Sequence, residues 1–199
     1  MSDPGLEDLP IFPLNAVLFP GGLLPLRIFE KRYMDMATAC LKNNSPFGVC
    51  LIRSGREVGA PATPEPIGCT ARIFDWDMQQ LGVLSVKTRG EQRFQIRQSR
   101  VTDAGLTRAS VELLPHDEDS TPPDQFAACT TLLKAVLDEH GAALLSGPMR
   151  LDSTSWVSSR LAEILPVPLA AKQKLLELQD AGQRLEILNK FLEQHRLAG

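Results

Sequence analysis

The feature that most constrains the fold of this chain is a change in the spacing of its apolar residues, a little past the middle of the sequence. Up to about residue 114, apolar and polar residues alternate in short runs separated by Gly and Pro, which is typical of half-buried β-strands. Ala109, Val111 and Leu113, for example, alternate with polar residues. After residue 124 the apolar residues recur every three or four positions, the period of amphipathic helices. The sequence therefore predicts an α+β protein, with a barrel or sandwich first and helices second.

The segment between the two patterns, residues 115–124, reads PHDEDSTPPD. It combines prolines with acidic residues and contains no large apolar side chain, which is typical of a boundary between folded parts. We therefore expect two subdomains, residues 1–116 with the strands and one helix, and residues 117–199 with the remaining helices. We interpret the acidic run at 117–119 as part of a solvated linker.

The expected elements of the first part follow from local patterns. A helix is predicted over residues 29–41, where Phe29 opens an apolar stripe, and it should end at Asn43 and Asn44. The predicted strands are 47–52, 68–76 and 81–98, with a turn near 78–80 and a second turn or a bulge at Gly90. Residues 60–66 contain three prolines and are predicted to form a surface loop.

Four helices are expected in the second part. The first has an apolar stripe from Phe126 to His140 and should stop at Gly141. The next two are predicted over residues 155–165 and 169–178. Asp180 is a suitable N-cap for a fourth helix, with a stripe that runs from Leu185 to His195.

Charge, hydropathy and cysteine spacing indicate the cellular compartment and the partners to expect for this protein. A formal net charge of -3 gives no overall attraction to nucleic acid or to anionic membranes. No run of about 18 apolar residues could span a bilayer, and the opening segment MSDPGLEDLP is acidic, unlike a secretory signal. The four cysteines lie far apart in apolar stretches, which favours reduced thiols. We therefore expect a cytoplasmic protein without a membrane partner.

Several segments together resemble the amino-terminal substrate-recognition domain of Lon proteases. They are LPIFPLNAVLFPGGLLPLRIFEKRY at 9–33, PFGVCLI at 46–52, IGCTARI at 67–73, VKTRGEQRFQI at 86–96 and the helical stretch 161–192. The resemblance implies a PUA-like antiparallel β-barrel followed by an α-helical bundle. It also implies a non-catalytic module that recognises unfolded or extended polypeptide without a cofactor, as an adaptor for a separate protease or chaperone in protein quality control. No Gly-x-x-x-x-Gly-Lys-Ser/Thr phosphate loop occurs, so we expect a stand-alone form without the ATPase and protease parts.

Catalytic and metal-binding chemistry is not expected. Ser158 or Ser159 could be paired with Lys172 as a serine–lysine dyad on residue type alone, but an activated nucleophile needs a desolvated lysine and oriented donors, whereas these residues lie in ordinary helical patterns. The three histidines, at positions 116, 140 and 195, have no spacing suited to a metal site.

A peptide-binding site is predicted around the strand 68–76. Strict alternation places Phe74 and Trp76 on one face together with Thr70 and Arg72. If that face is exposed, the aromatic pair and the apolar loop 20–24 would bind extended peptide, and the candidate residues are Leu23, Leu24, Phe74 and Trp76. The alternative is that both aromatic side chains are buried under the helical subdomain.

Two other functions remain open from the sequence. Arg89, Arg93 and Arg97 would share one face of a strand that continues through a bulge at Gly90, and such a stripe would bind RNA, although Arg93 also suits a structural role in the barrel. A small-molecule sensor or adaptor would instead need a closed pocket at the junction of the barrel and the helices.

Overall fold

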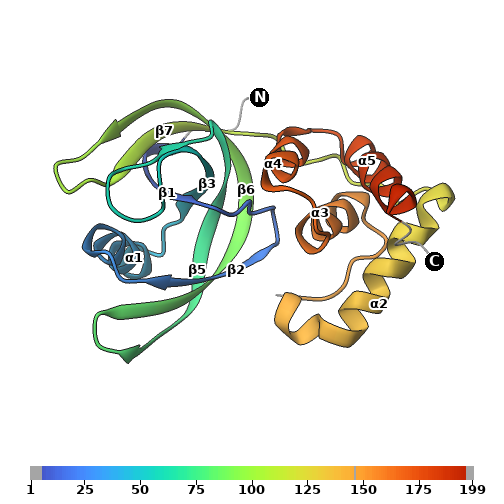
Figure 1. Cartoon of the computed structure of the whole chain (residues 1–199), viewed down its shortest axis with the longest axis horizontal. Coiled ribbons are helices and arrows are strands. Elements are labelled where there is room, and N and C mark those ends of the chain that lie inside the picture. Colours follow the sequence, from blue (N-terminus) through green and yellow to red (C-terminus); the bar gives the residue numbers. More distant parts are fainter. Residues whose placement is uncertain (1–5, 146, 196–199) are drawn as a thin grey trace. The chain divides into compact units, whose positions relative to one another are not determined.

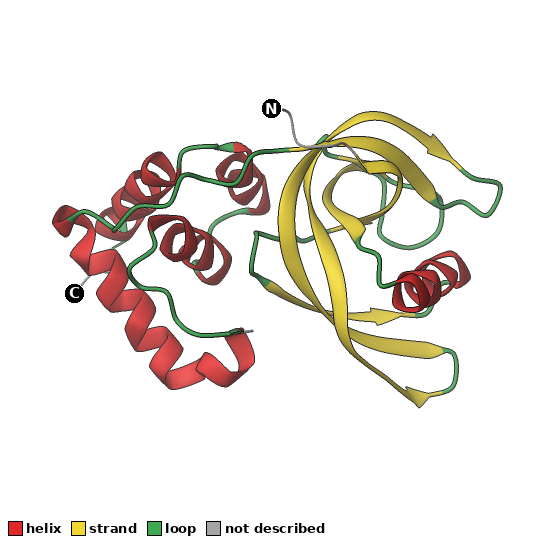
Figure 2. Ribbon diagram, turned by 180° about the vertical axis from the view of Figure 1, so that it is seen from behind, coloured by secondary structure: helices red, strands yellow, loops and turns green. Residues whose placement is uncertain are grey.

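The structure, a computed structural model, describes residues 6–145 and 147–195 and consists of two units, Met1–Pro115 and His116–Gly199 (Figure 1). Residues 1–5, which open the acidic N-terminal segment, lie outside the described residues. The described strands all belong to the first unit, and the second unit is helical (Figure 2). The structure therefore confirms the predicted α+β class.

The first unit is a small closed β-barrel. Its elements are β1 (Leu6–Leu14), β2 (Leu23–Ile28), α1 (Lys31–Asn43), β3 (Phe47–Ser54), β4 (Thr63–Pro64), β5 (Ile67–Gln80), β6 (Val83–Val101) and β7 (Thr107–Leu113). The strand order β1-β7-β6-β5-β3 closes on itself because β1 also pairs with β3, and this pair is parallel while the others are antiparallel. Strand β2 lies outside this circuit and pairs with β6.

Helix α1 packs one face against the barrel. Tyr33, Met36 and Cys40 are buried in the main core cluster, together with Phe47 from β3 and Val86 from β6. The helix ends as predicted, since Asn43 is its last residue and Asn44 adopts the left-handed conformation with φ 48°. The predicted start was wrong, because the helix begins at Lys31 and Phe29 precedes it with an exposed ring.

A bulge confirms the prediction at Gly90. The register of β5 and β6 shifts between the pairs Cys69–Arg93 and Ala71–Gly90. The loop after β1 lies against this point, because the N–H of Gly90 donates to the Gly22 carbonyl at 2.9 Å and the N–H of Gly21 donates to the Gly90 carbonyl at 2.7 Å. Only glycine fits here, since an added Cβ would lie 2.3 Å from the carbonyl oxygen of Phe19.

Two loop predictions need correction. The turn between β5 and β6 is formed by Leu81 and Gly82, which has a φ of 80°, and not by residues 78–80, which continue β5. The Pro-rich segment 60–66 is not wholly a loop, because Thr63 and Pro64 pair with β3 as β4 and Ala62 is buried.

The second unit contains a short 3-10 turn, η1 (Asp124–Phe126), and four helices: α2 (Ala127–Leu144), α3 (Thr154–Ile164), α4 (Leu169–Glu177) and α5 (Ala181–Gln194). Asp180 caps α5 as predicted, with its carboxylate accepting from the N–H groups of Gly182 and Gln183. The predicted stop at Gly141 was wrong, because α2 continues through it to Leu144. His140 and His195 are exposed and do not belong to the apolar stripes. None of the helices in the described part of the chain is long and apolar enough to cross a membrane.

Candidate functional site

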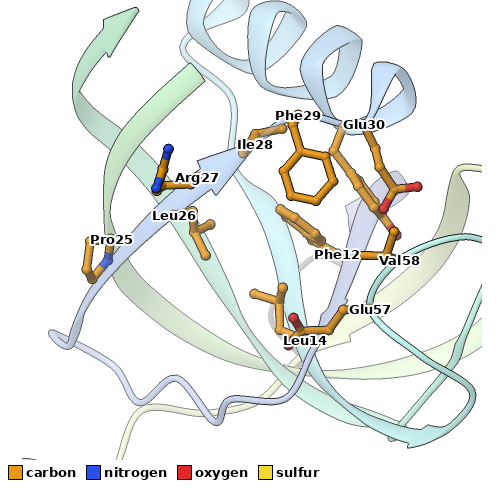
Figure 3. Close-up of a pocket in the computed structure, with 11 residues that line it drawn as sticks. Phe12, Leu14, Pro25, Leu26, Arg27, Ile28, Phe29, Glu30, Glu57 and Val58 are labelled. Atoms are coloured by element: carbon orange, nitrogen blue, oxygen red, sulfur yellow. The ribbon is translucent and has the colours of Figure 1, made fainter. Parts of the chain in front are cut away.

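An apolar pocket of about 190 Å³ opens in the first unit between β2 and β1 (Figure 3). Its walls come from consecutive residues of β2 and the turn after it, from β1, from α1 and from the loop after β3: Phe12, Leu14, Pro25, Leu26, Arg27, Ile28, Phe29, Glu30, Tyr33, Glu57 and Val58. We call this pocket the β2 pocket. In Figure 3, Leu26 points from β2 toward Leu14 and Phe12, while Pro25 and Arg27 lie on the other side of the ribbon.

Stacked aromatic rings form the floor of the β2 pocket. The rings of Phe12 and Tyr33 lie 4.0 Å apart between centroids at 20°, and Phe47 packs against Phe12 at 6.2 Å. The guanidinium of Arg32 lies 4.6 Å from the centre of the Tyr33 ring. Burial raises the pKa of the Tyr33 hydroxyl above its ordinary value, and the Arg32 charge acts in the opposite direction. The floor is therefore buried and formed by aromatic rings.

The rim of the β2 pocket combines exposed apolar side chains with carboxylates. Phe29 is 57% exposed and Val58 is 54% exposed, although both are large and apolar. The Glu30 carboxylate is paired with the buried guanidinium of Arg32 at 3.0 Å. The Glu57 carboxylate accepts a hydrogen bond from the backbone N–H of Asn15. Exposed apolar rims of this kind are typical of binding surfaces.

A second, broader hollow of about 670 Å³ lies beside the first and shares Pro25, Leu26 and Arg27 with it. It is also lined by Trp76 of β5 and Val86 of β6. Val86 pairs with Leu26 on one side and with Trp76 on the other, so these three side chains share one face of the sheet.

The predicted pairing of Phe74 with Trp76 on one face was wrong. A register shift between Ile73 and Asp75 inserts an extra residue into β5, and such a bulge reverses the alternation of side chains. Trp76 therefore lies on the face of Leu26, while Phe74 lies on the other face, where the Arg89 guanidinium is 5.6 Å from its ring centre. Both aromatic side chains are exposed, at 50% for Phe74 and 57% for Trp76. Thr70, expected on the same face as the pair, is buried.

The candidates Leu23 and Leu24 lie on β2 and are also separated by its alternation. Leu24 packs against the core with Leu26, while Leu23 pairs with Arg89 on the face of Phe74. The four candidate residues therefore do not form one patch. Trp76 lines the second hollow, and Leu24 packs against the core without lining either hollow. Leu23 and Phe74 lie on the opposite face of the sheet.

The predicted arginine stripe is broken by the same kind of irregularity. Arg93 is only 3% exposed and donates to the carbonyl of Pro115 at 3.3 Å, because the bulge after Gly90 turns it inward. Arg89 lies over Phe74, and Arg97 is paired with Glu112. The three guanidinium groups therefore do not share an exposed face.

The serine and lysine residues considered for catalysis have structural partners. The Ser158 hydroxyl is fully buried and donates to the Ser155 carbonyl at 3.2 Å. The Lys172 ammonium donates to the Glu163 carbonyl at 2.6 Å, and burial lowers its pKa. Within residues 6–145 and 147–195, no group of three or more His, Cys, Asp or Glu side chains has a metal-binding arrangement.

Sequence reasoning missed the residues that form the β2 pocket, above all Phe12, Phe29 and Val58. Phe29 was assigned to the helix because it continues the apolar stripe of α1. Val58 carries a usable signal, since it is the only large apolar side chain in the polar loop RSGREVGA at 53–60. An isolated apolar residue in a loop at the surface is a reason to look for a binding rim.

The chain thus combines a closed barrel that has an apolar pocket at its side with a helical unit that follows it in sequence. The sequence of residues 8–194 matches the family described as the ATP-dependent protease La (LON) substrate-binding domain, and the chain belongs to this family. The Lon N-terminal domain protein from Xanthomonas campestris is 37% identical and superposes with a TM-score of 0.77 over 92% of this chain and 97% of that one.

Two curated relatives show how much of a larger protein the match represents. Lon protease from Paraburkholderia phytofirmans is 28% identical over 189 residues, which are 90% of this chain and 23% of that protein. Protein cereblon from Gallus gallus is 29% identical over 117 residues, 57% of this chain and 25% of that protein. The chain thus spans about a quarter of the length of these relatives.

Proposed function

We propose that this domain recognises unfolded or extended polypeptide by taking apolar side chains into the β2 pocket. The observation that carries the proposal is the exposure of Phe29 and Val58 directly above the buried Phe12 and Tyr33 floor. Covering large apolar side chains at a surface removes them from water, which is favourable. Binding of an apolar side chain in a pocket with this rim therefore lowers the free energy. No chemical step is part of this function.

The size of the β2 pocket supports a side chain as its guest. Pockets for drug-sized molecules usually have volumes of about 300–1,000 Å³. The β2 pocket has about 190 Å³ and is open on one side, so it suits one side chain of a longer chain better than a whole small molecule. The second hollow, at about 670 Å³, falls within the range for small molecules, so a small-molecule sensor is the second candidate for this surface.

The relatives support the same class of ligand. The matching family is described as a substrate-binding domain, and the Lon protease from Paraburkholderia phytofirmans matches 90% of this chain. A role in presenting clients to a protease or chaperone in the cytoplasm extends this proposal. RNA binding has less support, because Arg93 is buried and Arg97 is paired with a carboxylate.

The test is the binding of a fluorescent unfolded polypeptide to the 199-residue protein, with a mixed RNA pool in parallel. We expect polypeptide binding that persists at moderate salt and that weakens in Phe29→Ser and Val58→Ser. Val101→Ser is a matched control, since Val101 is 55% exposed and does not line the β2 pocket. Equal binding by all three variants, or RNA binding that falls steeply with salt, would contradict the proposal.

A further inference from the structure

Strand β2 is hydrogen-bonded along one edge only. It pairs with β6 from Leu23–Arg89 to Ile28–Leu84, and no other strand of the described chain pairs with it. An unpaired strand edge presents N–H and C=O groups that can accept another extended chain. This edge borders the β2 pocket, because consecutive residues from Pro25 to Glu30 line that pocket.

The direction of the backbone groups of β2 follows from its register. The N–H of Gly90 donates to the Gly22 carbonyl, so Gly22 faces β6. Because the hydrogen-bonding direction alternates along a strand, Leu24, Leu26 and Ile28 also face β6, and the Thr88 hydroxyl bonds to the Leu24 carbonyl accordingly. The other set, Leu23, Pro25 and Arg27, therefore directs its backbone groups to the open edge.

Pro25 lies at the centre of this open set. Proline has no N–H, and within sheets it is confined to positions where the missing donor is not needed, above all on edges. The open edge of β2 therefore offers a donor and an acceptor at Leu23 and Arg27 and only an acceptor at Pro25. A short extended segment can pair with such an edge. The pairing has one hydrogen bond fewer than in a regular sheet, because Pro25 cannot donate one.

The charges beside this edge favour a basic guest. Four carboxylates and two cations line the two hollows, but Glu30 is paired with Arg32 and Asp75 is paired with Lys87, so the preference depends on Glu57. The Glu57 carboxylate accepts from the uncharged N–H of Asn15, and within the described part of the chain no Lys, Arg or His side chain forms a salt bridge with it. An ammonium or guanidinium next to Glu57 would gain a charge-assisted hydrogen bond.

We propose that an extended, apolar polypeptide segment with a basic residue adds to the open edge of β2 as a short extra strand. Alternate side chains of this segment enter the β2 pocket beside Leu26, and the basic residue lies near Glu57. The inference rests on the proposed function, and it adds the mode of binding and the class of segment. The added strand can form hydrogen bonds in both directions at Leu23 and Arg27, whereas at Pro25 it can only donate to the carbonyl.

The decisive experiment uses N-methylated peptides in fluorescence anisotropy. A nine-residue apolar peptide with one lysine is made in two isomeric forms, N-methylated at alternate residues in one phase or in the other. Strand addition requires the N–H groups of one phase only, so one isomer should lose about tenfold or more in affinity and the other should stay within about threefold. Equal affinities of the two isomers overturn the proposal. The proposed function stands in that case if Phe29→Ser still weakens binding, and it fails with the inference if no peptide binds.

A substitution of Pro25 tests strand addition by changing the protein instead of the peptide. Pro25→Val supplies the missing N–H, so the unmethylated peptide should bind about threefold to tenfold more tightly. Pro61→Val is the control, because Pro61 is exposed and lies outside both hollows. Unchanged or weaker binding by Pro25→Val with an intact far-UV spectrum contradicts strand addition, and the N-methylated pair decides if that variant does not fold.

The charge and the alternative occupant are tested separately. Replacing the lysine of the peptide by norleucine should cost affinity in the wild type but not in Glu57→Gln, which keeps the acceptor for the Asn15 N–H. If the wild type binds the lysine and norleucine peptides with equal affinity, the preference for a basic residue is contradicted. Light scattering at increasing protein concentration examines the other guest, a second copy of this chain, and dimers whose formation abolishes peptide binding would assign the edge to that copy.

Discussion

Arg184 of α5 and Asp117 form an ion pair that is almost completely buried, with side-chain exposures of 1% and 6%. The two guanidinium nitrogens of Arg184 lie 2.9 and 2.5 Å from the same carboxylate oxygen, which also accepts from the Ser155 hydroxyl at 3.0 Å. Asp117 thus joins the start of the second unit to α3 and α5. The expectation that residues 117–119 are only a solvated linker was wrong for this residue.

Removal of this carboxylate should destabilise the helical unit strongly. Asp117→Ala leaves the Arg184 charge buried without its partner, which costs about 3–5 kcal/mol for pairs of this kind. Urea unfolding followed by circular dichroism measures the loss. Lys134→Ala in α2 is the matched control, because its ion pair with Asp138 is exposed and should change the stability by less than about 1 kcal/mol. A similar, small effect of both variants would contradict the buried pair.

Two glycine substitutions should have opposite effects. Gly90→Ala places a Cβ 2.3 Å from the Phe19 carbonyl oxygen, so the loop between β1 and β2 must move and the melting temperature should fall. Gly141→Ala lies within α2, where the nearest atom would be 4.0 Å away, and should stabilise the helix by about 0.5–1 kcal/mol. Calorimetry of both variants checks the signs, and an unchanged melting temperature for Gly90→Ala would refute the close approach.

Trp76 and Phe74 should differ in their effect on polypeptide binding. Trp76 lies on the face of Leu26 and lines the second hollow, whereas Phe74 lies on the opposite face under Arg89. We expect Trp76→Ala to weaken the binding of unfolded polypeptide several-fold and Phe74→Ala to leave it within about twofold, since truncation of an aromatic anchor costs most at the centre of an interface. Anisotropy titrations of both variants provide the comparison. A larger loss of affinity in Phe74→Ala than in Trp76→Ala would indicate that polypeptide binds the face of the sheet that carries Phe74.

The stability should fall in alkaline solution partly because of Cys129. Burial raises the pKa of this thiol to about 11 from its ordinary value of 9.0. The unfolded chain therefore releases the proton first, so the contribution of this group is complete below about pH 9 and is lost as the pH rises toward about 11. Urea midpoints at pH 8 and pH 10.5 should drop less in Cys129→Ala than in the wild type. Equal drops in both proteins would exclude this origin.

Local patterns were sufficient for much of the architecture. The apolar spacing located the helices, the Asp180 cap and the end of α1 at Asn43, because these depend on interactions between residues a few positions apart. The family motifs indicated the barrel, and the glycine at position 90 indicated a bulge. The errors at the ends of helices arose where apolar or breaking residues were read without their tertiary contacts, as at Phe29 and Gly141.

The candidate site was less accessible from the sequence, because it depends on which face each strand turns outward. A single extra residue between Ile73 and Asp75 reverses the alternation of β5 and separates Trp76 from Phe74. The bulge after Gly90 buries Arg93 in the same way and breaks the arginine stripe. Both bulges lie in the pairing of the neighbouring strands β5 and β6. Gly90 indicated one of them, but no residue pattern in 73–75 indicated the other, and neither side-chain direction follows from strict alternation.

The α+β class, the order of barrel and helices and the membership of the Lon substrate-binding family follow from the amino-acid sequence, because apolar spacing, composition and motifs encode them. The open edge of β2, the floor of Phe12 and Tyr33 beneath Phe29, and the position of Trp76 on the face of Leu26 become visible only in the folded protein. The physical reason is that barrel closure and bulges set the register between distant strands, and register decides which side chains meet.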